Sequence, residues 1–511
     1  MWPFSSTSPT IPQTGHGEAQ DPQSLAEKRV VRKVDLLLMP LLTISFGLQY
    51  YDKAVLGSAS IFGIIKDLGL STSSIDSETG KTVVSTLRYS TANSAFYWGY
   101  IIAVLPFALI LQRLPLAKTL SACIFLWGVC VILTVVVKNY EGLVVQRVFL
   151  GVLESSVSPG FVMITTQWYR KSEQASRLGI WYSATGIFSA FSGVVNYGLG
   201  SAGGSLAPWK YMYLFAGAWT ILWALVILIF IPDSPRLSQR WFNDQEREIL
   251  IKRSRENLSG RTELGKFEWS QVREAVKDLK IWCFCSWLRV FISAKNSGGV
   301  TAFGARIVSS FGYDSLTTIA ILIPGGAFTC AAIYLFTWIA GKWKNSLTYL
   351  IPISCVPVMV GAAIIWGASW DHRGVPLFGY YLLPCFGSPY VLLLALASQN
   401  VAGSTKKSVS TGAIFVGYNI GNIIAPYTVF TSERPEKYKS TWIAIFVSLG
   451  IVSILSLVVR WIMVRENEKR DREEEEKESS EKEEEEEEDF EERSEREDLT
   501  DRQNRRFRYS L

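Results

Sequence analysis

Two opposite charges, Arg147 and Glu154, lie within one apolar run that includes the stretch RVFLGVLESSVSPG at residues 147–160. A charged side chain at the centre of a membrane-spanning helix costs roughly 2.5 to 3.5 kcal/mol, so each should face a partner or a water-filled cavity. At about 100° per residue, seven residues bring both side chains to nearly the same helix face, with Gly151 between them. Because glycine has no side chain, another helix or a ligand can approach closely there. The spacing therefore predicts one charged stripe that faces a cavity or a partner helix.

Further charges lie well inside other apolar segments, Asp52 and Lys53 in the first and Arg289 and Lys295 in the seventh. At ~1.5 Å of rise per residue, Asp52 lies at a depth in the membrane similar to that of Arg147. Glu154 lies deeper, close to the depth of Arg289. We therefore expect Asp52 to meet Arg147, and Glu154 to form a second layer of opposite charge with Arg289. The alternative is a set of structural ion pairs that only lock helices together.

Basic residues outnumber acidic ones among these intramembrane charges, which favours an anionic ligand. Arg289 and Lys295 differ by about 120° around their helix, so only one of them should face a central cavity squarely. Intramembrane amides are candidate hydrogen-bond donors to a ligand, although they bridge helices about as often. The candidate substrate-binding residues are Lys53, Arg147, Arg289, Lys295, Asn296 and Asn419.

A proton carrier in these segments must be a carboxylate, because the two histidines, His16 and His372, lie outside them. Asp52 and Glu154 are the two candidates for proton coupling. Asp52 lies near the outer border, beside Lys53, which favours its charged form. Glu154 lies deeper, where burial favours the neutral form of a carboxyl group. We therefore expect Glu154 to bind and release the proton.

Enzymatic activity is not expected from this sequence. Without a histidine in any apolar segment, a histidine-ligated metal site or a histidine-based catalytic triad within the membrane is excluded. The seven cysteines fall inside apolar segments, where a thiol behaves as a small hydrophobic group, and they lack metal-site spacing. We expect no cofactor, no metal and no nucleic-acid partner, and transport rather than catalysis.

Twelve apolar segments of about 20 residues position these charges. That length crosses the ~30 Å of hydrocarbon in a bilayer, whereas core helices of soluble proteins are shorter and striped. The polar residues 1–33 contain no apolar targeting region, so the first segment itself should act as the targeting signal. The pattern predicts an all-α multi-pass protein in the lipid bilayer, with spans at 36–57, 90–111, 116–137, 142–164, 178–199, 211–231, 281–304, 316–340, 346–367, 375–400, 409–430 and 441–463.

Lysine and arginine are concentrated in one alternating set of short loops. The positive-inside rule places these loops, the basic central block and both termini in the cytoplasm. A glycosylation sequon at Asn257 would then remain unmodified. We expect residence in the plasma membrane. The basic residues that set this orientation are Arg113, Lys118, Arg170, Lys171, Arg177, Lys342, Lys344, Lys406 and Lys407.

The charged blocks divide the spans into two sets of six. Equal halves suggest an internally duplicated transporter with its site at their interface. The end of the chain, residues 465–511, holds 22 acidic and 12 basic residues. Its run 473–498 cannot bury apolar surface, so we expect disorder or a solvated charged helix rather than a regulatory element. The expected units are a disordered cytoplasmic N-terminus at 1–33, a six-helix bundle at 34–231, a cytoplasmic linker at 232–280, a six-helix bundle at 281–464 and a charged cytoplasmic tail at 465–511.

Short basic turns, QRLPLAKTL at 112–120 and GKWKNS at 341–346, lie at matching points of the two halves and resemble the cytoplasmic turn of the major facilitator superfamily. Five ordered blocks are more specific and resemble the fungal allantoate permease family, within the anion:cation symporters. This likeness runs from about residue 30 to residue 464 and returns at the C-terminus. The blocks are FGLQYYDKAVLGSASIFGI at 46–64, EQASRLGIWYSATGIFSA at 173–190, GGVTAFGARIVSSFGY at 298–313, NVAGSTKKSVSTGAIFVGYNIGNIIAP at 400–426 and DLTDRQNRRFRYSL at 498–511.

The resemblance implies the major facilitator fold, with twelve helices in two pseudo-symmetric six-helix bundles. It also implies alternating access and proton-driven movement of small organic anions such as ureido acids or vitamins. In the wider group an arginine followed seven residues later by a glutamate lines the cavity, which Arg147 and Glu154 match. The acid-base pair of the first helix is Asp-Arg in that group and Asp52-Lys53 here. Lysine lacks the bidentate carboxylate recognition of arginine, so the substrate range of the wider group does not carry over directly.

The leading interpretation is a monomeric, proton-coupled importer of a small carboxylate, ureido acid or vitamin-like anion. One alternative is an exporter of a fungal secondary metabolite on the same fold, because a fold sets neither direction nor ligand. The other is a transporter-like receptor that senses a nutrient without carrying it. Such a receptor would be expected to have an extended, structured cytoplasmic domain, and the low-complexity tail argues against one.

Overall fold

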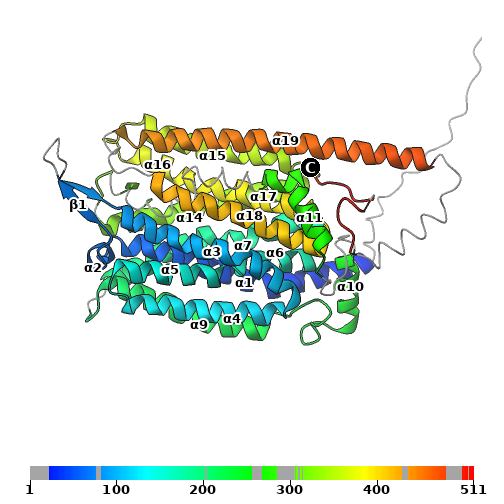
Figure 1. Cartoon of the computed structure of the whole chain (residues 1–511), viewed down its shortest axis with the longest axis horizontal. Helices are drawn as coiled ribbons and strands as arrows, with labels where there is room; N and C mark the ends of the chain where they lie inside the picture. The colour runs from blue at the N-terminus through cyan, green and yellow to red at the C-terminus, as the bar shows by residue number, and fades with distance from the viewer. Residues whose placement is uncertain are drawn as a thin grey trace, which may run out of the picture.

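The computed structural model describes residues 22–75, 82–201, 204–255, 267–284, 304, 307–308, 311–313, 315–428, 436–478, 498–504 and 506–511. Long helices run side by side along the longest axis of the molecule, and a short antiparallel hairpin lies at one end (Figure 1). In chain order the elements are α1 (Pro22–Ala59), α2 (Ile64–Asp67), β1 (Thr72–Ile75), β2 (Thr82–Ser85), α3 (Leu87–Arg113), α4 (Leu116–Leu133), η1 (Thr134–Val136), α5 (Tyr140–Glu154), α6 (Val157–Trp168), α7 (Lys171–Tyr182), α8 (Ala184–Ser201), α9 (Pro208–Phe230), α10 (Asp244–Arg255), α11 (Trp269–Lys277), α14 (Ser315–Lys342), α15 (Leu347–Gly367), α16 (Gly374–Leu382), η2 (Leu383–Phe386), α17 (Gly387–Gln399), α18 (Ser404–Ile424), η3 (Ala425–Thr428) and α19 (Lys439–Glu478).

Within these described ranges, nine helices are long and apolar enough to cross a membrane, with consecutive elements such as α5 and α6 counted as one. Two more helices, α1 and α18, carry more polar side chains and pack among the nine, α1 against α8 and α9 and α18 against α3. Each predicted span thus coincides with a helix, except the segment 281–304, which lies largely outside the described residues. Burial of apolar side chains between neighbouring helices and contact with lipid account for these lengths.

The hairpin of β1 and β2 is the one departure from helix among the described elements. Thr72 lies opposite Ser85 and Ile75 opposite Thr82 in an antiparallel register. Threonine, valine and isoleucine suit an extended strand, because branching at Cβ restricts the side chain in a helix. Hydropathy did not indicate this hairpin because it lies in a loop between two apolar segments.

The two halves of the chain meet along helix pairs that include α8 with α14 and α3 with α18. Gly186 of α8 and Gly326 of α14 bring their backbones into contact, since a Cβ added at Gly186 would lie 2.5 Å from the Gly326 carbonyl oxygen. Small residues permit such close approach between helices in membranes. The interface is therefore close-packed at this point, and a cavity between the halves must lie beside it.

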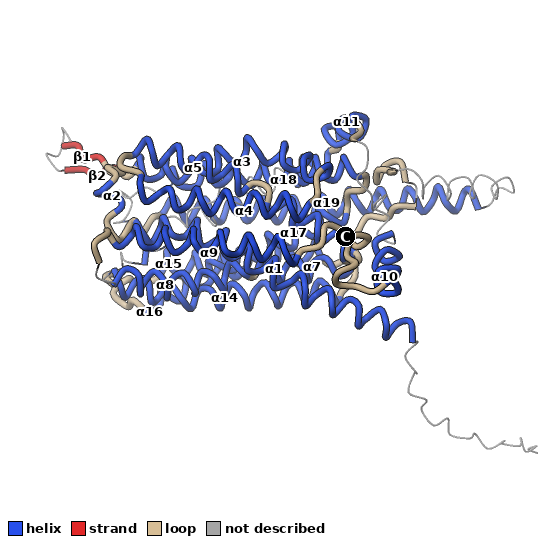
Figure 2. Tube along the Cα trace, turned by 90° about the horizontal axis from the view of Figure 1, so that it is seen from below, coloured by secondary structure: helices blue, strands red, loops and turns tan. Residues whose placement is uncertain are grey.

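The central linker is partly helical, and the two helices among its described residues bind different halves. In α10, Arg253 forms ion pairs with Glu27 of α1 and with Glu173 of α7, the latter at 2.6 Å. In α11, Gln271 accepts hydrogen bonds from the main-chain amides of Thr405 and Lys406 near the start of α18. Both linker helices and the C-terminus gather at the end of the molecule opposite the hairpin (Figure 2). This end is called the linker end below, and the opposite end the hairpin end.

The first and last helices are both longer than the expected spans. Residues 22–33, expected to be disordered, form the start of α1, because Val30 and Val34 are buried there. The helix of the last span does not end with the span near residue 464, because α19 continues through a run of strong helix formers to Glu478. At about 1.5 Å per residue its 40 residues extend roughly 60 Å, about twice the hydrocarbon thickness. Residues 498–504 and 506–511 pack back onto the bundle, and residues 479–497, which include most of the run expected to be disordered or solvated, lie outside the described residues.

Candidate functional site

A cavity of about 140 Å³ lies between the two halves of the chain. Its described lining comes from α1, α3, α7 and α8 on one side and from α14, α16, η2, α17 and α18 on the other. The lining is rich in tyrosine and small polar side chains, and Lys53 is the one charged residue among the described residues that line it. An interface position of this kind is where transporters built from two repeats bind their substrates. The aromatic residues around it are Phe46, Tyr50, Tyr97, Tyr182, Tyr380, Phe386 and Tyr418.

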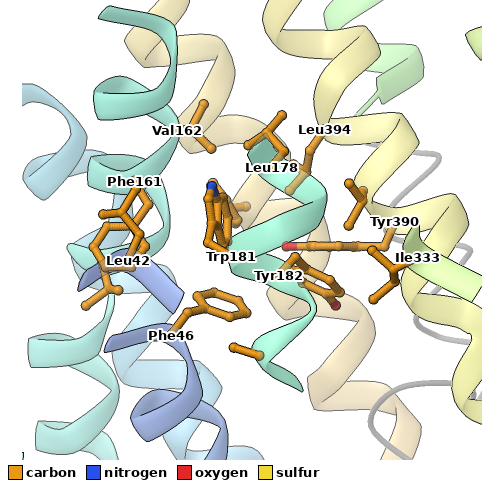
Figure 3. Close-up of a cluster of buried hydrophobic side chains, with 14 of the residues drawn as sticks. Leu42, Phe46, Phe161, Val162, Leu178, Trp181, Tyr182, Ile333, Tyr390 and Leu394 are labelled. Atoms are coloured by element: carbon orange, nitrogen blue, oxygen red, sulfur yellow. The ribbon is translucent and has the colours of Figure 1, made fainter. Parts of the chain in front are cut away.

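Two tyrosines from opposite halves close the cavity toward the linker end. The rings of Tyr182 of α7 and Tyr390 of α17 have centroids 4.6 Å apart, and Tyr390 also contacts Tyr418 at 5.5 Å. Figure 3 shows the Tyr182 and Tyr390 rings next to each other, with Phe46 and Trp181 nearby. The two tyrosine rings are tilted by 30°. The lining residues of α8 follow Tyr182 in the chain. In α17 the lining includes Gly387, the first residue of the helix, but neither Tyr390 nor the residues after it. The cavity therefore lies on the hairpin side of this aromatic contact.

Lys53 connects the cavity to the charged interior of the first half. Its ammonium lies 3.3 Å from Oε2 of Glu154 and 5.0 Å from the centre of the Phe96 ring. The side chain retains 18% exposure, whereas Glu154 is completely buried. The close approach of α3 to α5 positions Phe96, since a Cβ added at Gly151 would lie 1.8 Å from the Phe96 carbonyl oxygen. Gly151 thus admits a helix and not a ligand.

Glu154 is the last residue of α5, at the break where Ser155 and Ser156 separate this helix from α6. Gln49 of α1 donates a hydrogen bond of 3.1 Å to the Glu154 carbonyl oxygen, which is freed by the break. Its two carboxylate oxygens accept no hydrogen bond from the described residues. The ion pair with Lys53 is therefore the main compensation for burying this charge. A buried charge that loses its partner is strongly unfavourable, so Glu154 depends on Lys53.

Asp52 and Arg147 are also buried, at 1% and 2% exposure, but they do not form the expected ion pair. Instead Trp127 of α4 donates from Nε1 to Oδ2 of Asp52 at 2.5 Å. Arg147 donates from Nη2 to the hydroxyl of Tyr213 in α9 at 3.0 Å. The position of each residue along its helix predicts that both lie at a similar depth in the membrane. Their partners depend on the rotation of each helix about its axis, which the position does not give. Neither Asp52, Arg147 nor Glu154 lines the cavity directly.

Of the remaining predicted binding residues, one is described but does not line the cavity, and the others lie outside the described residues. Asn419 is buried in α18 and donates to the carbonyl oxygen of Phe415 in its own helix at 2.5 Å, outside the cavity lining. Arg289, Lys295 and Asn296, and with them the expected layer of Glu154 and Arg289, lie outside the described residues. Lys53 is thus the one predicted binding residue that the described structure places on the cavity wall.

Sequence reasoning missed most of the cavity wall. Gln49 precedes the charged pair of α1 by one helical turn and was not singled out, and neither were Tyr97, Tyr380 and Tyr418. Tyrosine is abundant in this chain, with 21 residues, so its presence in a span carries no signal of its own. A polar residue one helical turn before a buried charge is a better signal of a lining residue, because it shares a helix face with the charge.

Comparisons with known proteins agree with this architecture. Residues 42–426 match the family model of the Major Facilitator Superfamily. The chain is 31% identical over 483 residues to the uncharacterized transporter C757.13 of Schizosaccharomyces pombe, covering 94% of this chain and 87% of the relative. It is 29% identical over 502 residues to the allantoate permease of Saccharomyces cerevisiae, covering 95% and 87%.

Among solved structures, the chain resembles the proton:xylose symporter XylE from E. coli with a TM-score of 0.63. The sequences are 12% identical, and the match covers 86% of this chain and 96% of the symporter. At that identity the likeness concerns the fold, which is two six-helix bundles around a central site. The family match and the fungal relatives over nearly the whole length go further. The chain therefore belongs to the Major Facilitator Superfamily, within the group of fungal transporters that includes the allantoate permease.

Proposed function

We propose that this secondary transporter takes up a small organic anion together with a proton, by alternating access in the plasma membrane. The main observation in support is that Lys53 faces the cavity, whereas its ion-pair partner, Glu154, is buried and does not line the cavity. The class of transported anion is a carboxylate, ureido acid or vitamin-like acid. Because residues of both halves enclose the cavity within one chain, a monomer suffices for transport.

The cavity favours a small anion. Its volume of about 140 Å³ is below the roughly 300 to 1,000 Å³ of sites for drug-sized ligands. Lys53 provides a positive charge in a region whose other described lining residues are uncharged. An ammonium in such surroundings attracts an anion strongly, because little water screens it. The tyrosine hydroxyls and Gln49 supply hydrogen bonds that orient the rest of the ligand.

Coupling to a proton follows from competition for Lys53. A substrate carboxylate that binds the ammonium draws it away from Glu154, whose carboxylate has no hydrogen-bond donor among the described residues. A buried carboxylate without a partner is strongly unfavourable, and a proton on Glu154 removes that cost. Anion binding and protonation therefore favour each other, as linkage requires. Asp52 is the less suitable carrier, because Trp127 already donates to it and it does not line the cavity.

The orientation of the protein is part of the same proposal. The basic loops, the linker helices α10 and α11 and residues 498–511 all lie at the linker end (Figure 2). The positive-inside rule favours the cytoplasm for this end, and therefore for both termini. The cavity then lies on the outer side of the contact between Tyr182 and Tyr390, which suits uptake from outside the cell.

The test is uptake into vesicles that contain the purified protein, with an imposed pH gradient, against a panel of carboxylates and their neutral amides. We expect at least one carboxylate to accumulate above its external concentration only when the gradient is present, and its amide not to accumulate. Accumulation that ignores the gradient would contradict proton coupling. Preference for the neutral amide would contradict an anionic substrate.

A further inference from the structure

The last residues of the chain form an ordered segment that the transport site does not use. Residues 498–511, called the terminal segment here, pack at the linker end against α11, α18, α19 and the loops before α15 and α18 (Figure 1). Phe507 and Tyr509 are buried at 1% and 3% exposure. The burial of these two aromatic rings, together with the polar contacts described next, shows that the rest of the chain forms a specific binding surface for this segment.

Asp501 is the centre of this surface and is completely buried. One carboxylate oxygen lies 2.5 Å from the ammonium of Lys406 in α18, and the other lies 2.8 Å from that of Lys280 after α11. The Tyr509 hydroxyl donates to the same carboxylate at 2.8 Å, and Lys280 lies 3.7 Å from the centre of the Tyr509 ring. Buried charges are retained where several partners satisfy them, as here.

The backbone of the terminal segment is also recognised. Arg470 of α19 donates to the carbonyl oxygens of Phe507 and Asp501 at 2.6 and 2.9 Å. Asn467 exchanges two hydrogen bonds with the main chain of Tyr509, at 2.9 and 3.0 Å. Asn400 exchanges two with the main chain of Ser510, at 2.7 and 2.9 Å. Paired hydrogen bonds between a side-chain amide and a peptide main chain can bind an extended peptide, as the main chain at the edge of a sheet does.

The segment reaches the contact between the two halves through one residue, Ser404, the first of α18. Asp498 accepts from the Ser404 amide at 2.8 Å and so caps the helix. Gln112 of α3, in the other half, donates to the Ser404 carbonyl oxygen at 2.6 Å and also bonds the Ser408 hydroxyl. The terminal segment and the opposite bundle therefore hold the same turn of α18 from two sides.

We propose that the terminal segment is a latch, an intramolecular peptide ligand that stabilises the conformation in which the two halves meet at the linker end. A ligand shifts a conformational equilibrium only through contacts that differ between the states. The contacts of Asp501, Phe507 and Tyr509 stay within the second half and anchor the segment. The cap by Asp498 also stays on this side, but it orders the turn of α18 to which Gln112 of the other half donates its hydrogen bonds. A docked segment therefore favours the state in which Gln112 reaches that turn. Opening the linker end separates Gln112 from that turn, and an undocked segment would leave the turn free to move.

The test measures distances across the linker end of the full chain without substrate, so it does not depend on the proposed cargo. Spin labels replace the exposed residues Leu114 in the first half and Trp343 in the second, in a background without native cysteines. Loss of one helix cap changes an equilibrium constant by about fivefold. We therefore expect Asp498→Ala to raise the population with the longer distance by about that factor. The same variant should speed amide hydrogen exchange in residues 404–408.

A matched control and a restoration experiment complete the test. Arg508→Gln should leave the distances unchanged, because Arg508 pairs with Asp471 and Glu474 at the surface of the segment. A chain that ends at Glu478 should show the longer distance. A synthetic peptide of residues 498–511 should restore the shorter distance in this chain. The same peptide with Asp501→Asn should not restore it. Should the truncated chain fail to fold, full-length Asp501→Asn takes its place. Unchanged distances in Asp498→Ala and in the truncated or Asp501→Asn chain would overturn the latch.

Discussion

The ammonium of Lys53 lies 3.3 Å from Oε2 of Glu154, so one ion pair joins α1 to the end of α5 and separates the cavity from the buried carboxylate. Lys53 is the member of the pair that faces the cavity, and Glu154 is the member that water does not reach. A ligand at the cavity can therefore act on the Glu154 carboxylate through Lys53, whereas Gln49, which also lines the cavity, contacts the Glu154 carbonyl oxygen. This arrangement makes the roles of the two residues separable by experiment.

Glu154→Gln should abolish accumulation of substrate driven by a pH gradient and leave exchange of substrate across the membrane largely intact. Glutamine keeps the size of the side chain but cannot bind and release a proton in this pH range. Vesicle uptake with and without a gradient, beside counterflow exchange, measures the two activities. Glu141→Gln, at the exposed start of the same helix, is the matched control and should behave as the unaltered protein. Persistent uphill transport in the Glu154 variant would move the proton-carrier role to Asp52.

Lys53→Gln should weaken affinity for the anionic substrate by about tenfold or more and affect a neutral analogue much less. The physical reason is the loss of the charge that a carboxylate meets on the cavity wall. Binding of both ligands to the purified protein, by calorimetry or competition, measures the difference. Lys138→Gln removes an exposed charge outside the cavity and should change neither affinity. An equal loss for both ligands in the Lys53 variant would point to a purely structural role.

Gly151→Ala should destabilise the protein by several kcal/mol, because the added methyl group would lie 1.8 Å from the Phe96 carbonyl oxygen and must force α3 and α5 apart. Thermal unfolding in detergent should show a clear fall in melting temperature. Gly450→Ala in α19 is the matched control, since nothing lies within 4 Å of its added Cβ. There the better helix propensity of alanine should leave stability equal or slightly higher. Equal melting temperatures in both variants would contradict the close approach of α3 and α5.

Binding of the terminal segment should be independent of pH between about 5 and 8. Burial alone would raise the pKa of Asp501, but Lys280 and Lys406 outweigh burial and hold this pKa at about 2. A carboxyl group with a lowered pKa stabilises the docked state above its ordinary pKa of ~3.9, and that stabilisation is lost as the pH falls toward 2. The other ionisable groups at this site include Asp278, Glu274, Arg470, Arg502 and Tyr509.

Affinity of the 498–511 peptide for the chain that ends at Glu478, measured across this pH range, checks the prediction. A peptide with Asp501→Asn lacks the charge and should bind at least tenfold more weakly at pH 7. A tenfold change in the affinity of the unaltered peptide between pH 6 and 8 would show that another group controls docking.

The orientation can be tested directly. A reporter attached after Leu511 should be cytosolic, and Asn257 should remain unglycosylated in a eukaryotic host. Both follow from the basic loops and the linker helices lying at one end of the molecule. An added sequon in the turn of the hairpin, between Ile75 and Thr82, should be glycosylated and serves as the positive control. A reporter found outside the cell would contradict the cytoplasmic placement of the linker end.

Much of this protein was determined by its sequence alone. Twelve apolar segments, their alternating basic loops and five family blocks predicted the all-α membrane fold and the superfamily, and the family match and the fungal relatives confirmed both. The reason is physical, since a bilayer requires about 20 apolar residues for each helix and rejects charges without a role. Burial of Asp52, Arg147 and Glu154 followed from the same rule.

Only the tertiary structure decided which charges meet. Composition and spacing give the depth of a side chain but not the rotation of its helix relative to the others. In the folded protein Asp52 accepts a hydrogen bond from Trp127, Arg147 donates one to Tyr213, and Lys53 forms an ion pair with Glu154. The docked terminal segment was likewise beyond the sequence, because acidic residues in a charged run look solvated until their partners are known. Asp501 is buried because Lys280 and Lys406 come together from segments more than a hundred residues apart, and long-range proximity of that kind exists only in the folded chain.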